Sequence, residues 1–370
     1  MTGRADRIHS RRRRRRRGYA FLALVCTASS LAGCIAPSQT PLTLREELVL
    51  RDRCVEVVKQ AVRYTEAGSV RAAGIEVMQR HCGAAAIEWF RSSLQDPSPG
   101  VRFAALIALG MAGDADAREW VLPFADDADA GVRLSALYAL HRLGDTGRTG
   151  EFASMMLRHD SADVRRDAAF LLGILDETGA AGLLARAMTD RDEGIRRQAL
   201  ESMARLGNEE AVQQLVFWSN SGLGPVRVRA LNALARLRRP SLAATFQYSL
   251  ESGEYLEVRL AAAAALGRLG RNDGFALAAA ALTFNEPRPR VPGDPPAEQI
   301  MRVRQLAAVA LGAIGDRHAL GALRRTLESN SDPRVQLAAA DAVLEIVGGV
   351  PDHQSPFAGN SPAADGRGGS

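Results

Sequence analysis

The sequence has few aromatic residues and none of the common catalytic motifs. Aromatic side chains make up 5% of the 370 residues, although 46% are hydrophobic, which indicates a core built mainly from Ala and Leu. None of the six histidines lies in a His-x-x-x-His, His-Glu or Cys-x-x-Cys arrangement, so no metal-ligand cluster is visible. A Gly-x-Ser-x-Gly motif, a phosphate-binding glycine loop and a dinucleotide fingerprint are also missing. We therefore expect neither an enzyme nor a bound metal or cofactor.

Basic charge is concentrated at the N-terminus. The whole sequence has a formal net charge of +5, but residues 1–33 hold nine arginines against one acid, Asp6. Residues 34–370 then carry 38 basic and 41 acidic residues, a net charge of −3. A basic patch large enough for nucleic acid is not supported by this distribution, so we expect no nucleic-acid partner.

One phrase recurs nine times, and its clearest copy is the ten residues from Val101 to Gly110. Successive copies begin 31 or 32 residues apart, with one interval of 45, a period typical of stacked-repeat proteins. Counted from the first residue as zero, position +4 is always Gly or Ala, and position +8 is Leu, Met or Val. At about 100° per residue, positions 0, +4, +8 and +11 form one stripe of an α-helix. The copies begin at Val70, Val101, Val132, Val164, Ile195, Val226, Val258, Val303 and Val335.

A second apolar helical segment follows each phrase, so each repeat is predicted to be a pair of antiparallel helices. Turn residues separate the two segments. Gly113, Gly144, Gly207 and Gly315 are each followed by Asp or Asn. Gly suits the position after a helix, and Asp or Asn can cap the next one.

The phrase resembles the HEAT-like repeats first described in phycobilisome lyases, which read D-x-x-x-x-V-R-x-x-A-x-x-A-L-G-x-L-G-D. The resemblance covers about residues 43–347. It implies an all-α fold, a right-handed α-solenoid of about nine HEAT-like two-helix repeats in the armadillo-like superfamily. Such a fold hosts many functions. Deoxyhypusine hydroxylases, another HEAT-like family, hold iron with His-Glu pairs that have no counterpart in this sequence.

The first 33 residues resemble the signal peptide of a bacterial lipoprotein. A basic segment ends at Arg17, an apolar run follows, and Leu31-Ala-Gly-Cys34 resembles a lipobox. The resemblance implies cleavage before Cys34, acylation of its thiol and a short tether over residues 34–42. A plain transmembrane anchor is the alternative, but the apolar run is short and interrupted by polar residues. Ile35 follows the cysteine, where Asp favours inner-membrane retention in enteric lipoproteins. We therefore expect a lipid-anchored protein of the cell envelope, in the outer membrane and facing the periplasm.

Two cysteines, Cys54 and Cys82, remain in the expected exported chain. Each lies 14 residues from Gly68, near the predicted turn between the first two helices. Equal arms of an antiparallel hairpin place them side by side, and export permits oxidation. The pattern predicts a Cys54–Cys82 disulfide, with two unrelated buried thiols as the alternative.

Two segments depart from the repeats. A Pro-rich insertion over residues 285–298 accounts for the long interval and is predicted to be a stiff surface loop. It is either a tolerated insertion or a recognition arm. Residues 348–370 are rich in Gly, Pro and Ser and are predicted to be disordered.

Arginine occupies position +1 in eight of the nine copies. Repetition of this kind favours a structural role over ligand binding. With nearby acids such as Asp96, Asp127 and Asp190, the arginines are predicted to form a ladder between turns.

Positions +2 and +6 point away from the core stripe, toward the concave surface that this helix lines in HEAT-like solenoids. In three adjacent copies, five of these six positions carry large apolar side chains where polar ones are expected, and the sixth is Arg166. An exposed patch of this kind marks an interaction site, unless the side chains pack against flanking helices. The predicted function is a scaffold that binds a protein or peptide partner, and the alternative is an enzyme of a HEAT-like lyase or hydroxylase type. The predicted partner-binding residues are Phe103, Ile107, Leu134, Tyr138 and Phe170.

Overall fold

The computed structural model describes residues 41–175, 177, 179–288 and 294–348. Within these residues all regular structure is helical and there is no β-strand, which confirms the all-α prediction. None of the described helices has the length and apolar character needed to cross a membrane. The predicted signal peptide, Cys34 and nearly all of the tether lie outside the described residues, as does the tail beyond Gly348.

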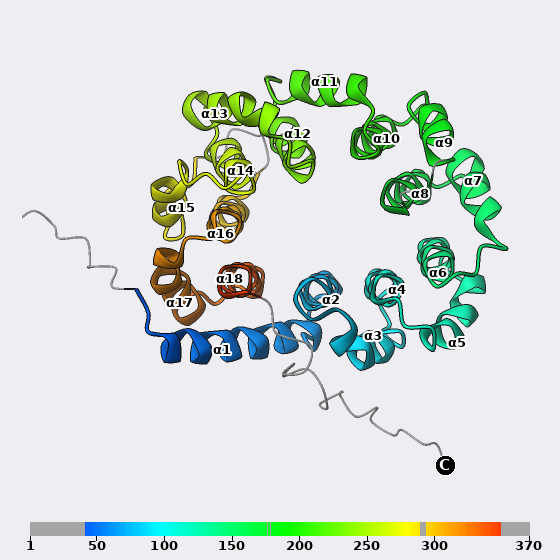
Figure 1. The fold of residues 1–370 in the computed structure, drawn as a ribbon, viewed down its shortest axis with the longest axis horizontal. Coiled ribbons are helices and arrows are strands. Elements are labelled where there is room, and N and C mark those ends of the chain that lie inside the picture. Colours follow the sequence, from blue (N-terminus) through cyan, green and yellow to red (C-terminus); the bar gives the residue numbers. More distant parts are fainter. Residues whose placement is uncertain (1–40, 176, 178, 289–293, 349–370) are drawn as a thin grey trace, which may run out of the picture. The chain divides into compact units, whose positions relative to one another are not determined.

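Each copy of the phrase lies in an α-helix, and these helices form an inner row in Figure 1, where they are seen nearly end-on. They pack side by side in chain order. The inner helices are α2 (Gly68–Cys82), α4 (Pro99–Ala112), α6 (Ala130–Arg142), α8 (Ala162–Leu175), α10 (Glu193–Arg205), α12 (Gly224–Arg236), α14 (Leu256–Gly267), α16 (Pro296–Ile314) and α18 (Pro333–Val347).

A second, outer row covers the inner helices (Figure 1). All its members except α1 are shorter than the inner helices. Short 3-10 helices adjoin four of them, at Gly83–Ala86, Leu122–Asp126, Pro240–Leu242 and Arg317–Ala319. The outer helices are α1 (Leu44–Val62), α3 (Ile87–Ser93), α5 (Ala117–Val121), α7 (Thr149–Arg158), α9 (Ala180–Ala187), α11 (Glu209–Trp218), α13 (Ala243–Ser252), α15 (Phe275–Ala281) and α17 (Leu320–Ser329).

Helix ends follow the predicted turn chemistry. Gly113, Gly144, Gly207 and Gly315 all have left-handed φ values, between 70° and 92°, a conformation that glycine adopts without steric cost. The Asn208 side chain then caps α11 by accepting a hydrogen bond of 2.8 Å from the Ala211 backbone. The glycine and capping pattern therefore marks where each repeat turns.

Successive inner helices approach closely at a glycine near the end of the phrase. A Cβ atom on Gly110 of α4 would lie 2.7 Å from the Ala139 Cα atom of α6. The same relationship recurs between Gly312 of α16 and Ala342 of α18, where the distance would be 2.9 Å. Small residues at these points let the backbones of neighbouring repeats touch.

Three of the eight arginines at position +1 form the predicted ladder with aspartates, and the side chains of the other five donate to backbone carbonyls. Arg71 donates to both carboxylate oxygens of Asp96, at 2.7 and 2.8 Å. Arg165 does the same to Asp190, at 2.9 and 3.1 Å, and also donates to the His159 carbonyl at 2.7 Å. Because each aspartate precedes the phrase of the following repeat, the bonds join neighbouring repeats.

The two ends of the helical repeats pack against each other. Helix α1 contacts α18 as well as α2, and Figure 1 shows it crossing both helices. Asp341 of α18 pairs with Arg80 and His81 of α2, and Glu47 of α1 pairs with Arg317. Helix α18 therefore covers the side of the first repeat that would be bare in an open array.

The insertion is shorter than predicted. Helix α16 begins at Pro296, so residues 296–298 belong to its first turn, where proline is well tolerated. Residues 285–288, 294 and 295 are not helical. The remaining residues of the insertion, 289–293, lie outside the described part of the chain.

Candidate partner-binding site

The inner helices enclose a cavity of about 690 Å³, which we call the lumen. It is lined mainly by two positions of the repeated phrase, +6 and +10, which lie one helical turn apart. Position +6 contributes Glu76, Ile107, Tyr138, Phe170, Val309 and Asp341. Position +10 contributes Arg80, Met111, Ile174, Arg205, Arg236, Arg268 and Glu345.

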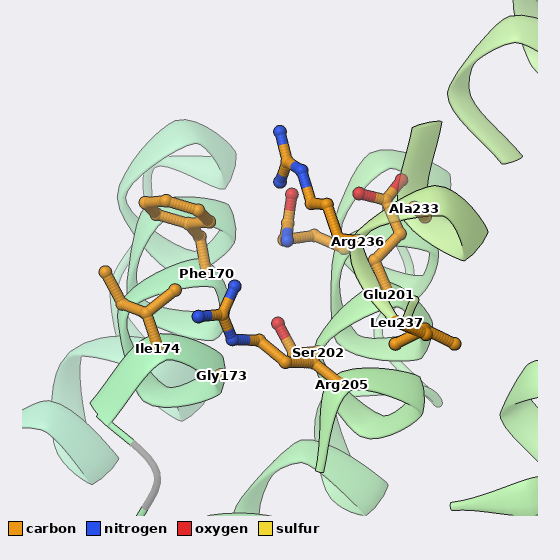
Figure 2. Close-up of a pocket in the computed structure, with 10 residues that line it drawn as sticks. Phe170, Gly173, Ile174, Glu201, Ser202, Arg205, Ala233, Arg236 and Leu237 are labelled. Atoms are coloured by element: carbon orange, nitrogen blue, oxygen red, sulfur yellow. The ribbon is translucent and has the colours of Figure 1, made fainter. Parts of the chain in front are cut away.

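One side of the lumen is apolar and includes three of the predicted binding residues. Phe103, Ile107 and Phe170 are half-buried and line the cavity. Figure 2 shows Phe170 and Ile174 side by side on α8, with the Arg205 side chain of α10 reaching toward them. The concave placement predicted for position +6 is thus observed, and the binding role of these three residues stays a prediction.

The other two predicted residues are not exposed. Leu134 is 0% and Tyr138 2% exposed, so the expectation of five exposed apolar side chains was wrong for this pair. Both lie on α6, between α4 and α8. Because the inner row curves, side chains of the flanking helices cover the inward face of α6. Tyr138 still lines the lumen, and burial raises the pKa of its hydroxyl.

The opposite side of the lumen is rich in arginine. Arg205, Arg236 and Arg268 come from or directly follow α10, α12 and α14, and Arg238 lies two residues beyond α12. No hydrogen bond or ion pair joins the side chain of any of these four arginines to another described residue. Burial lowers the pKa of Arg268, Glu345 opposes this shift, and the charges of Arg236, Arg238 and Arg80 lower it further.

Acidic side chains share the same cavity. Glu76 lines the lumen and is largely surrounded by protein. This burial raises its pKa, although the charges of Arg80 and Arg236 act to lower it. Glu345 lies near Arg268. Asp341 is already paired with Arg80 and His81. Five arginines and three acids line the lumen, so a surplus of positive charge remains.

The row at position +10 was not predicted, because the predicted binding residues came only from positions +2 and +6 on the face opposite the apolar stripe. Arginine recurs at +10 in Arg80, Arg142, Arg205, Arg236 and Arg268. This recurrence was a readable signal, because +6 and +10 share one helix face.

The predicted disulfide is not observed. Cys54 on α1 and Cys82 on α2 are both buried, and the described residues contain no disulfide between them. Figure 1 shows α1 from the side and α2 nearly end-on, so the two axes cross. The prediction assumed antiparallel axes, and a crossing moves residues apart as they leave the contact point. That contact is near Gly74, where a Cβ atom would lie 2.9 Å from the Val62 nitrogen.

Two other predictions about sites meet different outcomes. Cys34, the predicted lipid anchor, lies outside the described residues. Among the residues that the structure describes, no group of three or more His, Cys, Asp or Glu side chains is placed to hold a metal ion.

Comparison with protein families identifies the repeats. Residues 55–141 and 151–222 match the family model of HEAT repeats. The chain contains HEAT repeats. Residues 303–329 match the model of the PBS lyase HEAT-like repeat, so the resemblance seen in the sequence is supported for these parts of the HEAT-repeat region. No curated protein matches the chain.

Solved structures with a similar arrangement share little sequence with these HEAT repeats. Human deoxyhypusine hydroxylase in complex with glycerol is 17% identical, with 82% of this chain and 98% of that chain covered and a TM-score of 0.36. The complex of CpcE and CpcF of phycocyanin lyase from Nostoc sp. PCC7120 is 15% identical, with 74% and 98% covered and a TM-score of 0.39. UNC-45 from Drosophila melanogaster is 15% identical, with 82% and 54% covered and a TM-score of 0.38.

Proposed function

We propose that this chain is a lipid-anchored scaffold of the cell envelope that binds a protein or peptide partner in the lumen. The observation that supports binding is the combination of half-buried apolar side chains with arginines that lack a described partner. Monomeric proteins seldom leave such a surface bare, and apolar cavities with a few convergent polar groups are typical ligand sites. Repeats that contact only their neighbours leave their inner face available for a partner.

The binding site is tested by a pair of double variants. Phe103→Ser with Phe170→Ser removes two apolar side chains of the lumen. Phe217→Ser with Tyr248→Ser removes two aromatic side chains that are 72% and 58% exposed on the outer helices α11 and α13. We expect cross-linking in the host to recover a partner with the wild-type chain and with the outer double variant, but not with the lumen double variant. Equal recovery by both variants would place the binding site outside the lumen.

The anchor is tested at Cys34, because thiol acylation requires that residue. In Cys34→Ser we expect loss of acylation and of membrane partitioning, whereas the wild-type chain should begin at Cys34 and carry lipid. Several acyl chains hold a protein firmly, whereas one alone gives marginal binding. Mass spectrometry of the N-terminus and membrane fractionation measure the two effects. If Cys34→Ser were processed and partitioned like the wild-type chain, the lipoprotein assignment would be wrong.

A binding role is also distinguishable from an enzymatic one. HEAT-like hydroxylases depend on iron, so elemental analysis of the purified chain separates the two classes. Stoichiometric iron or zinc would contradict the scaffold proposal.

A further inference from the structure

Every cation of the lumen is an arginine, and the chemistry of that side chain restricts what it binds. The guanidinium group is planar and donates two parallel hydrogen bonds to a carboxylate. Arg205 and Arg236 lie on the adjacent helices α10 and α12 and both line the lumen. Figure 2 shows the two side chains around the same pocket as Phe170. Since neither has a described ion-pair partner, their donors are available to a ligand.

A role at the helix ends alone does not explain this arrangement. Arginine in the last turn of a helix interacts favourably with the helix dipole, and this accounts for one arginine per helix. It does not account for Arg205, Arg236, Arg238 and Arg268 all lining one cavity. There the charges of Arg236 and Arg238 help to lower the pKa of Arg268. Like charges held together in a cavity favour an anion between them.

Arg238 provides an independent observation. Its φ of 50° makes it the one non-glycine residue with a left-handed backbone among the described residues. It occupies position +12 of its repeat, where Gly113, Gly144 and Gly315 adopt the same conformation in others. A residue with a Cβ atom is strained there. Strained positions of this kind occur where a side chain has a function, and the Arg238 side chain lines the lumen.

We propose that the lumen binds a peptide segment that carries acidic side chains beside a large apolar one. This inference rests on the proposed function and specifies the chemistry of the partner. The carboxylates would be held by Arg205, Arg236 and Arg238, and the apolar side chain would pack against Phe103 and Phe170.

The volume of the lumen and the charges that line it are both compatible with a bound peptide segment. A cavity of about 690 Å³ lies in the range of sites for small ligands and short segments, about 300–1,000 Å³. Glu76 and Glu345 line the same cavity and disfavour a densely charged anion such as a polyphosphate. The same two carboxylates can accept hydrogen bonds from the backbone N–H groups that a peptide offers.

The test uses fluorescein-labelled short peptides and fluorescence anisotropy with the purified full chain. One peptide has Phe-Glu-Leu-Glu at its centre between Gly-Ser flanks, a second has Phe-Gln-Leu-Gln, and a third has Ser-Glu-Ser-Glu. We expect the first peptide to bind and the other two to bind at least roughly tenfold more weakly. Added salt should lower the affinity of the first peptide most.

Two sets of variants connect binding to the arginines. The double variant Arg205→Gln with Arg238→Gly should bind the acidic peptide roughly tenfold or more weakly than the wild-type chain, because charged hydrogen bonds are lost. Arg238→Gly alone should also raise the melting temperature, because glycine relieves the left-handed strain. Arg186→Gln with Arg325→Gln removes two exposed arginines from the outer helices α9 and α17 and should leave binding unchanged.

Three results would overturn the proposal. The first is equal binding of the acidic and amide peptides, and the second is no binding of the acidic peptide up to about 1 mM. The third is displacement of the acidic peptide by equimolar inorganic phosphate, which would identify a phosphate site instead. In each case the capture experiment with Phe103→Ser and Phe170→Ser still decides whether a partner occupies the lumen, so the two proposals can fail separately.

Discussion

The Nε2 atom of His81 lies 2.7 Å from the Oδ1 atom of Asp341, which joins the second helix of the chain to the last one. The two side chains are 7% and 14% exposed. Arg80 pairs with the other carboxylate oxygen of Asp341. Contacts between α1 and α18 accompany this pair, so the first repeat is covered on the side that would be bare in an open array.

Asp341→Asn should destabilise the fold by about 1–3 kcal/mol, because it removes the charge that His81 and Arg80 share. Urea unfolding measures the change. The matched control is Glu328→Gln, which breaks the exposed pair with Arg53 at 3.3 Å and should cost less than about 1 kcal/mol. Equal effects of the two variants would show that the Asp341 contacts contribute no more than a surface ion pair.

The same aspartate should make stability depend on pH. Burial acts to raise its pKa, but the hydrogen bond to His81 and the charge of Arg80 prevail and hold the pKa of Asp341 below its ordinary value of 3.8. A lowered pKa contributes stability above the ordinary value, and this contribution disappears as the pH falls toward the folded-state pKa. The stability difference between wild type and Asp341→Asn should therefore shrink between pH 6 and about pH 3. A constant difference over this range would exclude the ionised Asp341 as its source.

The sequence predicted the local structure because each repeat contains its own signals. The spacing of the phrase placed every copy on a helix, and Gly113, Gly144 and Gly315 ended helices as expected. Packing between the first and last repeats could not be predicted in this way. It depends on small rotations between repeats that add up over the whole array, and no single phrase encodes them.

The candidate site was predicted in part. Position +6 does face the lumen, but curvature decides whether a side chain there is open or covered. Phe103 and Phe170 remain half-buried, whereas Tyr138 between them is covered by its neighbours. The sequence contains the residue types and the face they occupy, and only the arrangement of the helices shows which of them meet.

Arg165→Lys tests the ladder between repeats. Lysine keeps the charge but cannot form the paired bonds to Asp190 together with the bond to the His159 carbonyl. We expect a loss of about 1–3 kcal/mol in unfolding free energy. The control is Arg166→Lys, since Arg166 is 42% exposed and its partner Asp163 is 77% exposed. A comparable loss in both variants would indicate that the ladder geometry is not important for stability.

Folding should protect the thiols of Cys54 and Cys82 from alkylation. Burial raises the pKa of the Cys54 thiol to about 12, so the reactive thiolate is scarce near neutral pH. We expect iodoacetamide to label neither Cys54 nor Cys82 in the folded chain, and both after unfolding without a reductant, as mapped by mass spectrometry. Labelling that requires prior reduction would instead establish the disulfide that the sequence predicted.

A close approach between two repeats is tested by making the same substitution at two glycines, one at the approach and one away from it. Gly182→Ala in α9 has no atom within 4 Å of the new Cβ, so the higher helix propensity of alanine should stabilise the fold by up to about 1 kcal/mol. Gly110→Ala in α4 gains the same propensity but places a Cβ atom 2.7 Å from the Ala139 Cα atom. The new Cβ atom is fixed to the α4 backbone and the Cα atom belongs to the α6 backbone, so α4 and α6 must separate. We expect a net loss of about 1–3 kcal/mol in unfolding free energy. Thermal and urea unfolding of the two variants give the comparison. If Gly110→Ala were as stable as Gly182→Ala, the inner helices would be free to move apart, and direct contact between their backbones would not hold the repeats together.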